Sequence, residues 1–172
     1  MLKYIEQFIK SNYHKELNLS EEEFIKSIPE PKIKTSKDFN KILLVIPMID
    51  LKKQLELTNI KLNVNLNKIN INNTHTKPYW IIFQDGSKNR GKSPNFCLDN
   101  LNNNEKGLNI IEGISMYLQY PEVVDDHSVD LIGSKYGNEC NTTIYKWNDK
   151  VMISAICSDI SDSMCGSATC LI

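Results

Sequence analysis

Residues 107–136 read GLNIIEGISMYLQYPEVVDDHSVDLIGSKY, and they carry the strongest structural signals in the chain. Asn109 can cap a helix, and Glu112 three residues later can close a capping box. Apolar residues recur at helical spacing from residue 110 to residue 118, which predicts one broad buried face. Pro121 has no amide hydrogen to donate and ends the helix. The segment therefore predicts a core helix of about three turns, around which the rest of the chain is arranged.

An acidic corner follows this helix and is the first candidate functional site. Asp125, Asp126, His127 and Asp130 bring three carboxylates and an imidazole within six positions. Such a cluster can bind a divalent cation, or an Asp–His pair can act as a general acid and base. It can equally form a turn in which aspartate side chains cap backbone amides and His127 is half exposed. The run lacks the ligand spacing of a metal site, so we predict no metal.

We expect a binding surface where this corner meets the polar loop at residues 85–94. A Gly-Ser turn at residues 133–134 lies further along the same segment and leads into a β-hairpin. Polar residues in turns on a rigid scaffold supply a large share of binding contacts in proteins. The residues predicted to form this surface are Asp125, Asp126, His127, Asp130, Gly133, Ser134 and Tyr136.

The composition limits the functions that the chain can have. With 172 residues it has the length of one domain, and its formal net charge of -1 provides no electrostatic attraction for nucleic acid. Arg90 is the only arginine, whereas proteins that read base sequences rely on arginine side chains. We therefore expect no nucleic-acid partner.

Neither a secretion signal nor a membrane span is predicted. Residues 1–17, MLKYIEQFIKSNYHKEL, are charged throughout, and no apolar run in the chain approaches the ~20 residues that cross a bilayer. The five cysteines include no CxxC pair, and an odd number favours reduced thiols. These features predict a cytoplasmic protein with no cofactor and no membrane partner. Cys165 and Cys170 are close enough in sequence to pair or to share a metal.

The remaining elements predict an α+β fold in a single domain. Residues 1–40 have the pattern of amphipathic helices, and residues 41–172 that of a sheet with the central helix packed on it. Residues 42–46 form a continuous apolar run, which is typical of a strand in the centre of a sheet. Residues 60–71 alternate between apolar and polar side chains and predict a half-buried antiparallel strand with a bulge or a tight turn. We expect one mainly antiparallel, or mixed, sheet with strands near residues 42, 62, 80, 143 and 152.

The loop at residues 86–93, GSKNRGKS, matches the phosphate-loop pattern G-x-x-x-x-G-K-[ST] at every fixed position. In a nucleotide-binding enzyme the glycines would turn amides toward the phosphates, the lysine would reach the β and γ groups, and the serine would hold Mg²⁺. The residues in these roles would be Gly86, Gly91, Lys92 and Ser93. Pro94 and only a short helical stretch follow, however, whereas a phosphate loop continues into a long helix. A lysine-rich surface loop is the favoured interpretation, and nucleotide binding is the alternative.

Several sequence blocks occur in a recognisable order from Pro78 onward, namely PYWIIFQDG, EKGL, EGI, YPEVV, GSKYG and GSAT. In its C-terminal half the chain resembles a family of small bacterial proteins of unknown function. The resemblance implies a shared domain and implies no catalytic residues.

These observations favour a non-enzymatic interaction or ligand-binding module with a protein or small-molecule partner. The motivating feature is a polar, turn-rich corner on an otherwise ordinary scaffold. Two enzymatic alternatives stay open. One is a nucleotide-dependent enzyme that uses Lys92 and Ser93, and the other is a hydrolase in which His127 and an acidic residue exchange a proton.

Overall fold

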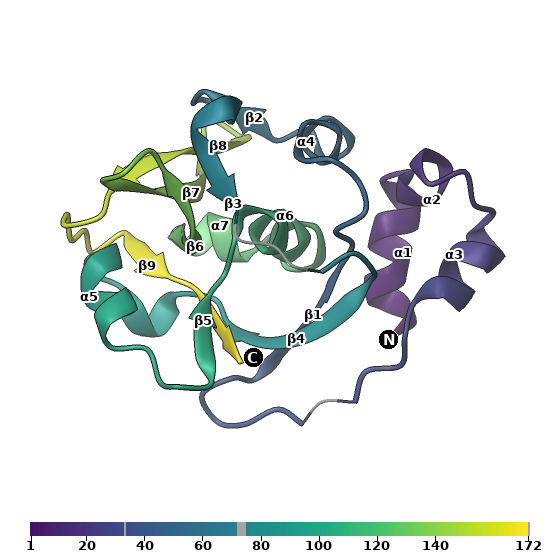
Figure 1. Cartoon of the computed structure of the whole chain (residues 1–172), viewed down its shortest axis with the longest axis horizontal. Coiled ribbons are helices and arrows are strands. Elements are labelled where there is room, and N and C mark those ends of the chain that lie inside the picture. Colours follow the sequence, from purple (N-terminus) through teal and green to yellow (C-terminus); the bar gives the residue numbers. More distant parts are fainter. Residues whose placement is uncertain (33, 72–74, 172) are drawn as a thin grey trace.

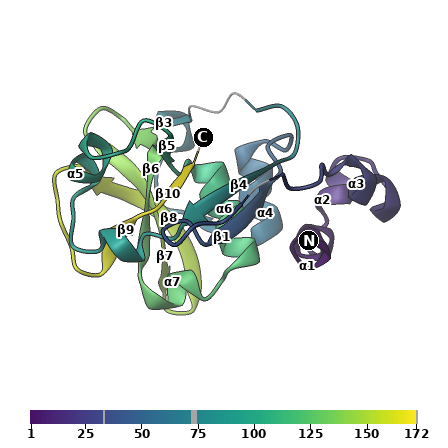
Figure 2. The same cartoon turned by 90° about the horizontal axis from the view of Figure 1, so that it is seen from below.

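A computed structural model describes residues 1–32, 34–71 and 75–171 of the chain. It has the predicted α+β fold, with helices and two β-sheets. Figures 1 and 2 show the N-terminal helices on one side of the molecule and a central helix between the sheets. The strands near residues 42, 62, 80, 143 and 152 are divided between the two sheets rather than gathered in one.

The first sheet is fully antiparallel. Its strands, in spatial order, are β1 (Lys41–Val45), β4 (Tyr79–Gln84), β10 (Thr169–Leu171) and β5 (Glu105–Gly107). Strand β1 lies at the edge of this order, so its predicted central position is wrong. Its sequence is continuously apolar because both of its faces are covered. Leu43 and Val45 belong to the main core, whereas Leu44 belongs to the cluster of the N-terminal helices.

The N-terminal helices form a separate layer against the outer face of β1 (Figure 1). They are α1 (Leu2–Lys10), α2 (Tyr13–Glu16) and α3 (Glu21–Ser27). Phe8, Tyr13 and Phe24 are fully buried in the cluster that joins this layer to the strand. Ser20 and Glu23 form a reciprocal capping box that starts α3.

The second sheet is mixed. Its main path runs through β2 (Lys61–Leu62), β8 (Lys150–Cys157), β7 (Cys140–Trp147), β6 (Ser128–Tyr136) and β3 (Ile69–Ile71), and β9 (Cys165–Ser167) also pairs with β6. Strands β6, β7 and β8 pair antiparallel, whereas β2 and β9 pair parallel with their neighbours. Asn148 and Asp149 both have positive φ, as expected for the tight turn that joins β7 to β8.

The segment at residues 60–71 is interrupted, as the predicted bulge or tight turn requires, but it is not one antiparallel strand. It is split by the 3-10 helix η1 (Leu66–Lys68) into β2 and β3. The two short strands pair with β8 and β6, which places them at opposite edges of the second sheet. Alternation of apolar residues indicates a half-buried strand, but it does not indicate which strand pairs with it.

Helix α6 (Ile110–Gln119) lies between the two sheets and begins with the predicted capping box of Asn109 and Glu112. Ile110, Ile114 and Met116 are fully buried, in one cluster with side chains of both sheets. Helix α4 (Leu51–Thr58), capped by Asp50, also contacts α6. The short helix α7 (Val123–Asp126) follows the proline stop and leads into β6. This burial identifies α6 as the core helix that the sequence predicts.

The two sheets meet where β5 crosses β6, at Gly107 and Gly133. A Cβ on Gly133 would lie 2.4 Å from the carbonyl oxygen of Gly107, and a Cβ on Gly107 would lie 2.8 Å from the amide nitrogen of Gly133. The Gly133 amide donates to the Leu108 carbonyl at 2.9 Å. Only residues without a side chain permit two backbones to approach so closely. We call this contact the glycine crossing.

We expect Gly133→Ala to lower the free energy of unfolding by about 3 kcal/mol, because the new methyl group would overlap backbone atoms that cannot move aside. Gly137→Ala is the matched control. Its Cβ would meet no atom within 4 Å, and its cost is about 1 kcal/mol for the positive φ of 60°. Urea unfolding followed by tryptophan fluorescence measures both values. Equal losses in the two variants would contradict the importance of the glycine crossing.

Candidate functional site

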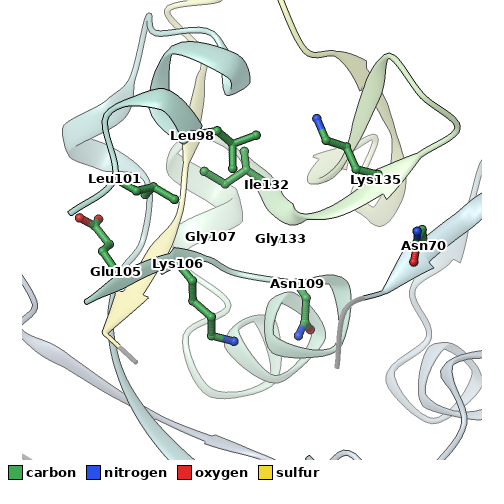
Figure 3. A pocket seen from close by; sticks show the side chains of 10 residues that line it. All are labelled: Asn70, Leu98, Leu101, Glu105, Lys106, Gly107, Asn109, Ile132, Gly133 and Lys135. Carbon is green, nitrogen blue, oxygen red and sulfur yellow. The ribbon is translucent and has the colours of Figure 1, made fainter. Parts of the chain in front are cut away.

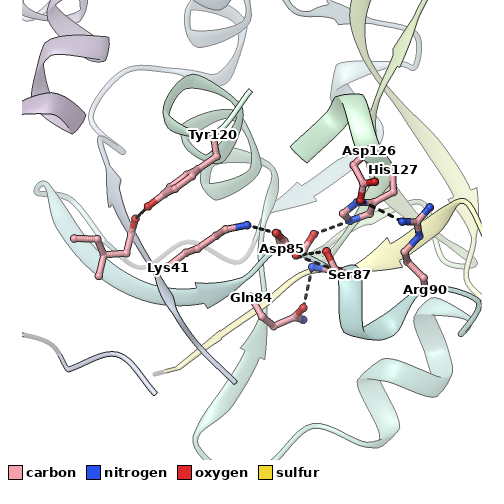
Figure 4. Close-up of polar contacts among 10 residues, drawn as sticks. Lys41, Gln84, Asp85, Ser87, Arg90, Tyr120, Asp126 and His127 are labelled. Atoms are coloured by element: carbon pink, nitrogen blue, oxygen red, sulfur yellow. Dashed lines mark hydrogen bonds and ion pairs between the residues drawn. The ribbon is translucent and has the colours of Figure 1, made fainter. Parts of the chain in front are cut away.

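The predicted corner does meet the loop at residues 85–94, through His127 (Figure 4). Its Nε2 lies 2.9 Å from the carbonyl oxygen of Asp85, and its Nδ1 lies 3.1 Å from Oδ2 of Asp126. Both partner atoms are acceptors, so a ring nitrogen forms its hydrogen bond only when it carries a hydrogen. Only 3% of His127 is exposed, which differs from the predicted half-exposed side chain. The ring therefore fastens the loop to the end of α7.

The aspartates of the corner are already paired with cations. Arg90 Nη1 lies 3.1 Å from the same Asp126 oxygen that contacts the imidazole, and Lys146 Nζ lies 2.7 Å from Oδ1 of Asp125. Both aspartates are largely exposed, so each ion pair contributes little to stability. The corner is a set of internal contacts, and binding a ligand there would require breaking some of them.

Asp85 anchors the other side of the same loop. Its carboxylate accepts hydrogen bonds from the Lys41 ammonium and from the amide and hydroxyl of Ser87. Burial opposes ionisation of Asp85, but these hydrogen bonds outweigh it and lower the pKa to about 2. The ionised carboxylate thus links the loop to β1 of the first sheet.

Asp130 lies apart from the corner, inside the protein between β7 and β9. It is completely buried, and neither carboxylate oxygen has a hydrogen-bond partner among the residues that the structure describes. Burial raises the pKa of Asp130 to about 6, because an ionised carboxylate is poorly solvated there. This carboxyl group cannot reach the predicted binding surface.

Ser134 and Tyr136 lie at the far end of β6 and do not join the corner either. The Ser134 hydroxyl is buried and accepts a hydrogen bond at 2.9 Å from the amide of Ile110, at the start of α6. Tyr136 pairs with Ile69 of β3 and Cys140 of β7. The predicted surface therefore divides into a loop-fastening corner and a separate helix contact, because β6 is extended and carries its two ends apart.

In the loop at residues 86–93, which matches the phosphate-loop pattern, backbone amides donate hydrogen bonds to other residues of the chain. The amide groups that donate within the chain are those of Gly86, Ser87, Asn89, Gly91 and Lys92. The Gly91 amide, for example, lies 3.1 Å from the carbonyl oxygen of Asp162. A phosphate cradle needs successive amides that point together at an empty space. Four of these amides instead bond to acceptors within residues 84–89, and only the Gly91 amide holds the loop against the C-terminal segment.

The other motif positions also have local roles. Gly86 has a φ of 97°, and a Cβ there would lie 2.4 Å from the carbonyl oxygen of Gly166, so packing against β9 requires glycine. The Ser93 hydroxyl caps the short helix α5 (Pro94–Asp99) by accepting from the Phe96 amide. Lys92 Nζ contacts Oδ1 of Asn89 at 3.2 Å. The brief helix after the loop agrees with the sequence prediction.

A cavity of about 550 Å³ lies beside the glycine crossing (Figure 3). Its lining residues are Asn70, Leu98, Leu101, Glu105, Lys106, Gly107, Asn109, Ile132, Gly133 and Lys135. They come from β3, the end of α5, β5, the start of α6 and β6, which are far apart in sequence. Figure 3 shows the apolar side chains gathered on one side of the two glycines. We call this space the glycine-crossing cavity.

Two lysines border the cavity, and they differ in their partners. Lys106 Nζ lies 2.6 Å from Oε1 of the fully buried Glu112, which also accepts from the Tyr79 hydroxyl at 3.0 Å. The pKa of Lys106 is raised, because burial, which lowers it, is outweighed by the attraction of Glu112. Lys135 Nζ contacts only neutral acceptors, Oδ1 of Asn141 at 3.3 Å and Oγ of Ser158 at 3.5 Å. Among the described residues no carboxylate forms an ion pair with it.

Sequence reasoning missed every cavity residue except Gly133. The available signal was the pair of Gly-containing blocks EKGL and GSKYG, in which each glycine has a lysine nearby. Their convergence depends on the crossing of β5 and β6, which no local pattern specifies. A pairing of Cys165 with Cys170, which the sequence leaves open, does not occur: both thiols are free, in strands of different sheets.

Replacing His127 tests the loop-fastening contact. We expect His127→Ala to lower the free energy of unfolding by about 2–3 kcal/mol, because a buried ring and its hydrogen bonds are lost. Asp126→Ala, which removes only an exposed partner, should cost less than about 1 kcal/mol. Urea unfolding measures both. A His127→Ala variant as stable as the wild type would show that the imidazole does not hold the loop.

The raised pKa of Asp130 predicts an unusual dependence of stability on pH. Its pKa is about 6 in the folded state and near the usual 3.8 in the unfolded chain. Between these pH values the folded state binds more protons than the unfolded state. The contribution of Asp130 to the free energy of unfolding therefore rises by about 2 kcal/mol as the pH falls from 7 to 4.

Asp130→Asn removes this titration. We expect the difference in unfolding free energy between wild type and variant to change across the window from pH 4 to pH 7 and to level off outside it. Taking the difference cancels the titration of the other carboxylates. A difference that is constant with pH would contradict the raised pKa.

No group of three or more His, Cys, Asp or Glu side chains is placed to hold a metal ion in the part of the chain that the structure describes. None of the described helices combines the length and hydrophobicity needed to cross a bilayer. Comparison with protein-family models, with curated proteins and with solved structures finds no match for this chain. The resemblance to a family of small bacterial proteins therefore stays a prediction.

Proposed function

We propose that this chain is a non-enzymatic ligand-binding module whose small-molecule ligand occupies the glycine-crossing cavity. The observation that carries the proposal is Lys135, which lines this cavity and whose ammonium group has only neutral partners among the described residues. The volume of about 550 Å³ lies within the range of small-molecule sites. A half-buried cation without a counter-ion favours an anionic ligand.

The lining also indicates the shape of the ligand. Leu98, Leu101 and Ile132 provide an apolar wall, while Lys106 and Lys135 provide positive charge. Glu112 offsets the charge of Lys106. The Glu105 carboxylate also lines the cavity, where it accepts hydrogen bonds from the Thr169 hydroxyl and the Asn102 side-chain amide, so Lys135 is the proposed anion contact. This combination suits a molecule with one carboxylate or phosphate group and a short apolar body.

The same lining supports binding rather than catalysis. A nucleophilic enzyme site places a Ser, Cys or Thr beside a base that activates it. The side chains around this cavity are asparagine, leucine, isoleucine, glutamate and lysine. The imidazole of His127 is held elsewhere by Asp85 and Asp126, so it does not serve this cavity.

Hexanoate is a suitable probe, because it combines a carboxylate with an apolar chain. We expect it to shift backbone amide resonances around the cavity in an NMR titration, and we expect Lys135→Ala to weaken its binding about tenfold. Lys150→Ala, an exposed lysine in the β7–β8 hairpin, is the control of equal charge. Hexylammonium should cause no such shifts.

Two results would contradict the proposal. One is the absence of cavity shifts at tens of millimolar hexanoate, and the other is equal binding by wild type and Lys135→Ala. A parallel titration with Mg²⁺-ATP tests the alternative, which is nucleotide binding by the loop at residues 86–93. Shifts confined to residues 86–93 and lost in Lys92→Ala would favour nucleotide binding in place of the proposed cavity.

A further inference from the structure

Two cysteines face each other at the open end of the β7–β8 hairpin. Cys140 and Cys157 are directly opposite in the antiparallel register, and their sulfur atoms are 3.9 Å apart. Cys157 is exposed and Cys140 is half-buried, so an outside reagent can reach the pair. The chain between them folds back through the tight turn at Asn148 and Asp149.

The hydrogen bonds of the hairpin identify the type of this cross-strand pair. The amide of Ser158 donates to the carbonyl of Glu139 at 2.9 Å, so residues 139 and 158 form a hydrogen-bonded pair. Hydrogen-bonded and non-hydrogen-bonded pairs alternate along an antiparallel ladder, and Cys140 and Cys157 are the next pair. Non-hydrogen-bonded partners have Cα atoms about 4.5 Å apart, which is within the range that a disulfide spans.

The remaining thiols lack this arrangement. Cys97 and Cys170 are buried, and Cys165 lies half-buried in β9. Burial raises the pKa of Cys97 and Cys170 and raises that of Cys165 to about 11, which disfavours their reactive thiolates. A disulfide reagent, which is attacked by exposed thiolates, will therefore react first with the hairpin pair.

We propose that Cys140 and Cys157 form a thiol–disulfide exchange site that closes to an intramolecular disulfide on reaction with a low-molecular-weight disulfide. The Cys157 thiolate attacks one sulfur of the reagent, whose S–S bond breaks and releases one thiolate. Cys140 then gives its proton to water and attacks the Cys157 sulfur, which releases the second thiolate. Two protein thiols are oxidised, and the reagent is reduced to two small thiols.

The geometry assigns different parts to the two cysteines. Cys157 is the exposed group and makes the first attack. The Cys140 thiol donates a hydrogen bond to the Cys157 sulfur, so it already lies beside the sulfur that it attacks in the second step. Burial and this contact raise the pKa of Cys140, which suits the thiol that acts second.

The bond would fasten the strand ends that support the cavity lysine. Asn141 and Ser158 directly follow the two cysteines, are joined by a hydrogen bond of 2.7 Å, and both contact Lys135 Nζ. The exchange site itself does not depend on the proposed ligand, since it follows from the hairpin alone.

The full chain, treated with oxidised glutathione and then quenched with acid, provides the test. We expect the count of free thiols in denaturant to fall from five to three, and peptide mapping by mass spectrometry to find Cys140 joined to Cys157. Cys165→Ser is the matched control and should still form the bond. A reducing thiol should restore all free thiols.

Cys140→Ser keeps the attacking thiol but removes the resolving one, so it should hold one glutathione on Cys157 as a stable mixed disulfide. The wild type should contain at least about tenfold less of this adduct, because the neighbouring thiol displaces it. Equal amounts of adduct in both proteins would overturn the proposal. So would a cross-link that involves Cys97, Cys165 or Cys170 in the folded chain.

Discussion

The close contact of two backbones at Gly107 and Gly133 is the constraint on which the rest of this structure depends. Helix α6 packs between the two sheets, and at this contact their backbones touch. The same contact places the Ser134 hydroxyl at the start of α6, where it accepts from the Ile110 amide. It also leaves a cavity to one side, because two strands that cross without side chains cannot fill the space around them.

Two buried carboxyl groups, those of Glu112 and Asp130, differ in their hydrogen-bond partners. Glu112 is fully buried but receives hydrogen bonds from Tyr79, Lys106 and the Asn109 amide. Asp130 is equally buried and has no hydrogen-bond partner among the described residues. A buried charge with good partners is tolerated, whereas one without them destabilises the fold until it is protonated. Glu112 therefore supports the core, and Asp130 is a weak point of the fold at neutral pH.

The loop at residues 86–93 shows how a motif can match in sequence and differ in physical chemistry. Phosphate binding needs amides that are free to point at an anion, and it needs a long helix behind them. Here most of the amides bond to neighbouring residues, Gly86 packs against Gly166, Gly91 has a positive φ of 75°, and Ser93 caps α5. Close approach of Gly86 to Gly166 explains the conformation of the loop without any ligand.

The sequence by itself determined the features that depend on neighbours along the chain. These include the capping boxes of α3 and α6, the Asp50 cap of α4 and the turn at Asn148 and Asp149, because hydrogen bonds within three or four residues specify them. Only the tertiary structure decided the division of the strands into two sheets, the burial of His127, the glycine-crossing cavity and the facing thiols of Cys140 and Cys157. Each of these results from the pairing of distant segments, and alternating or apolar patterns do not encode which strands pair or in which register.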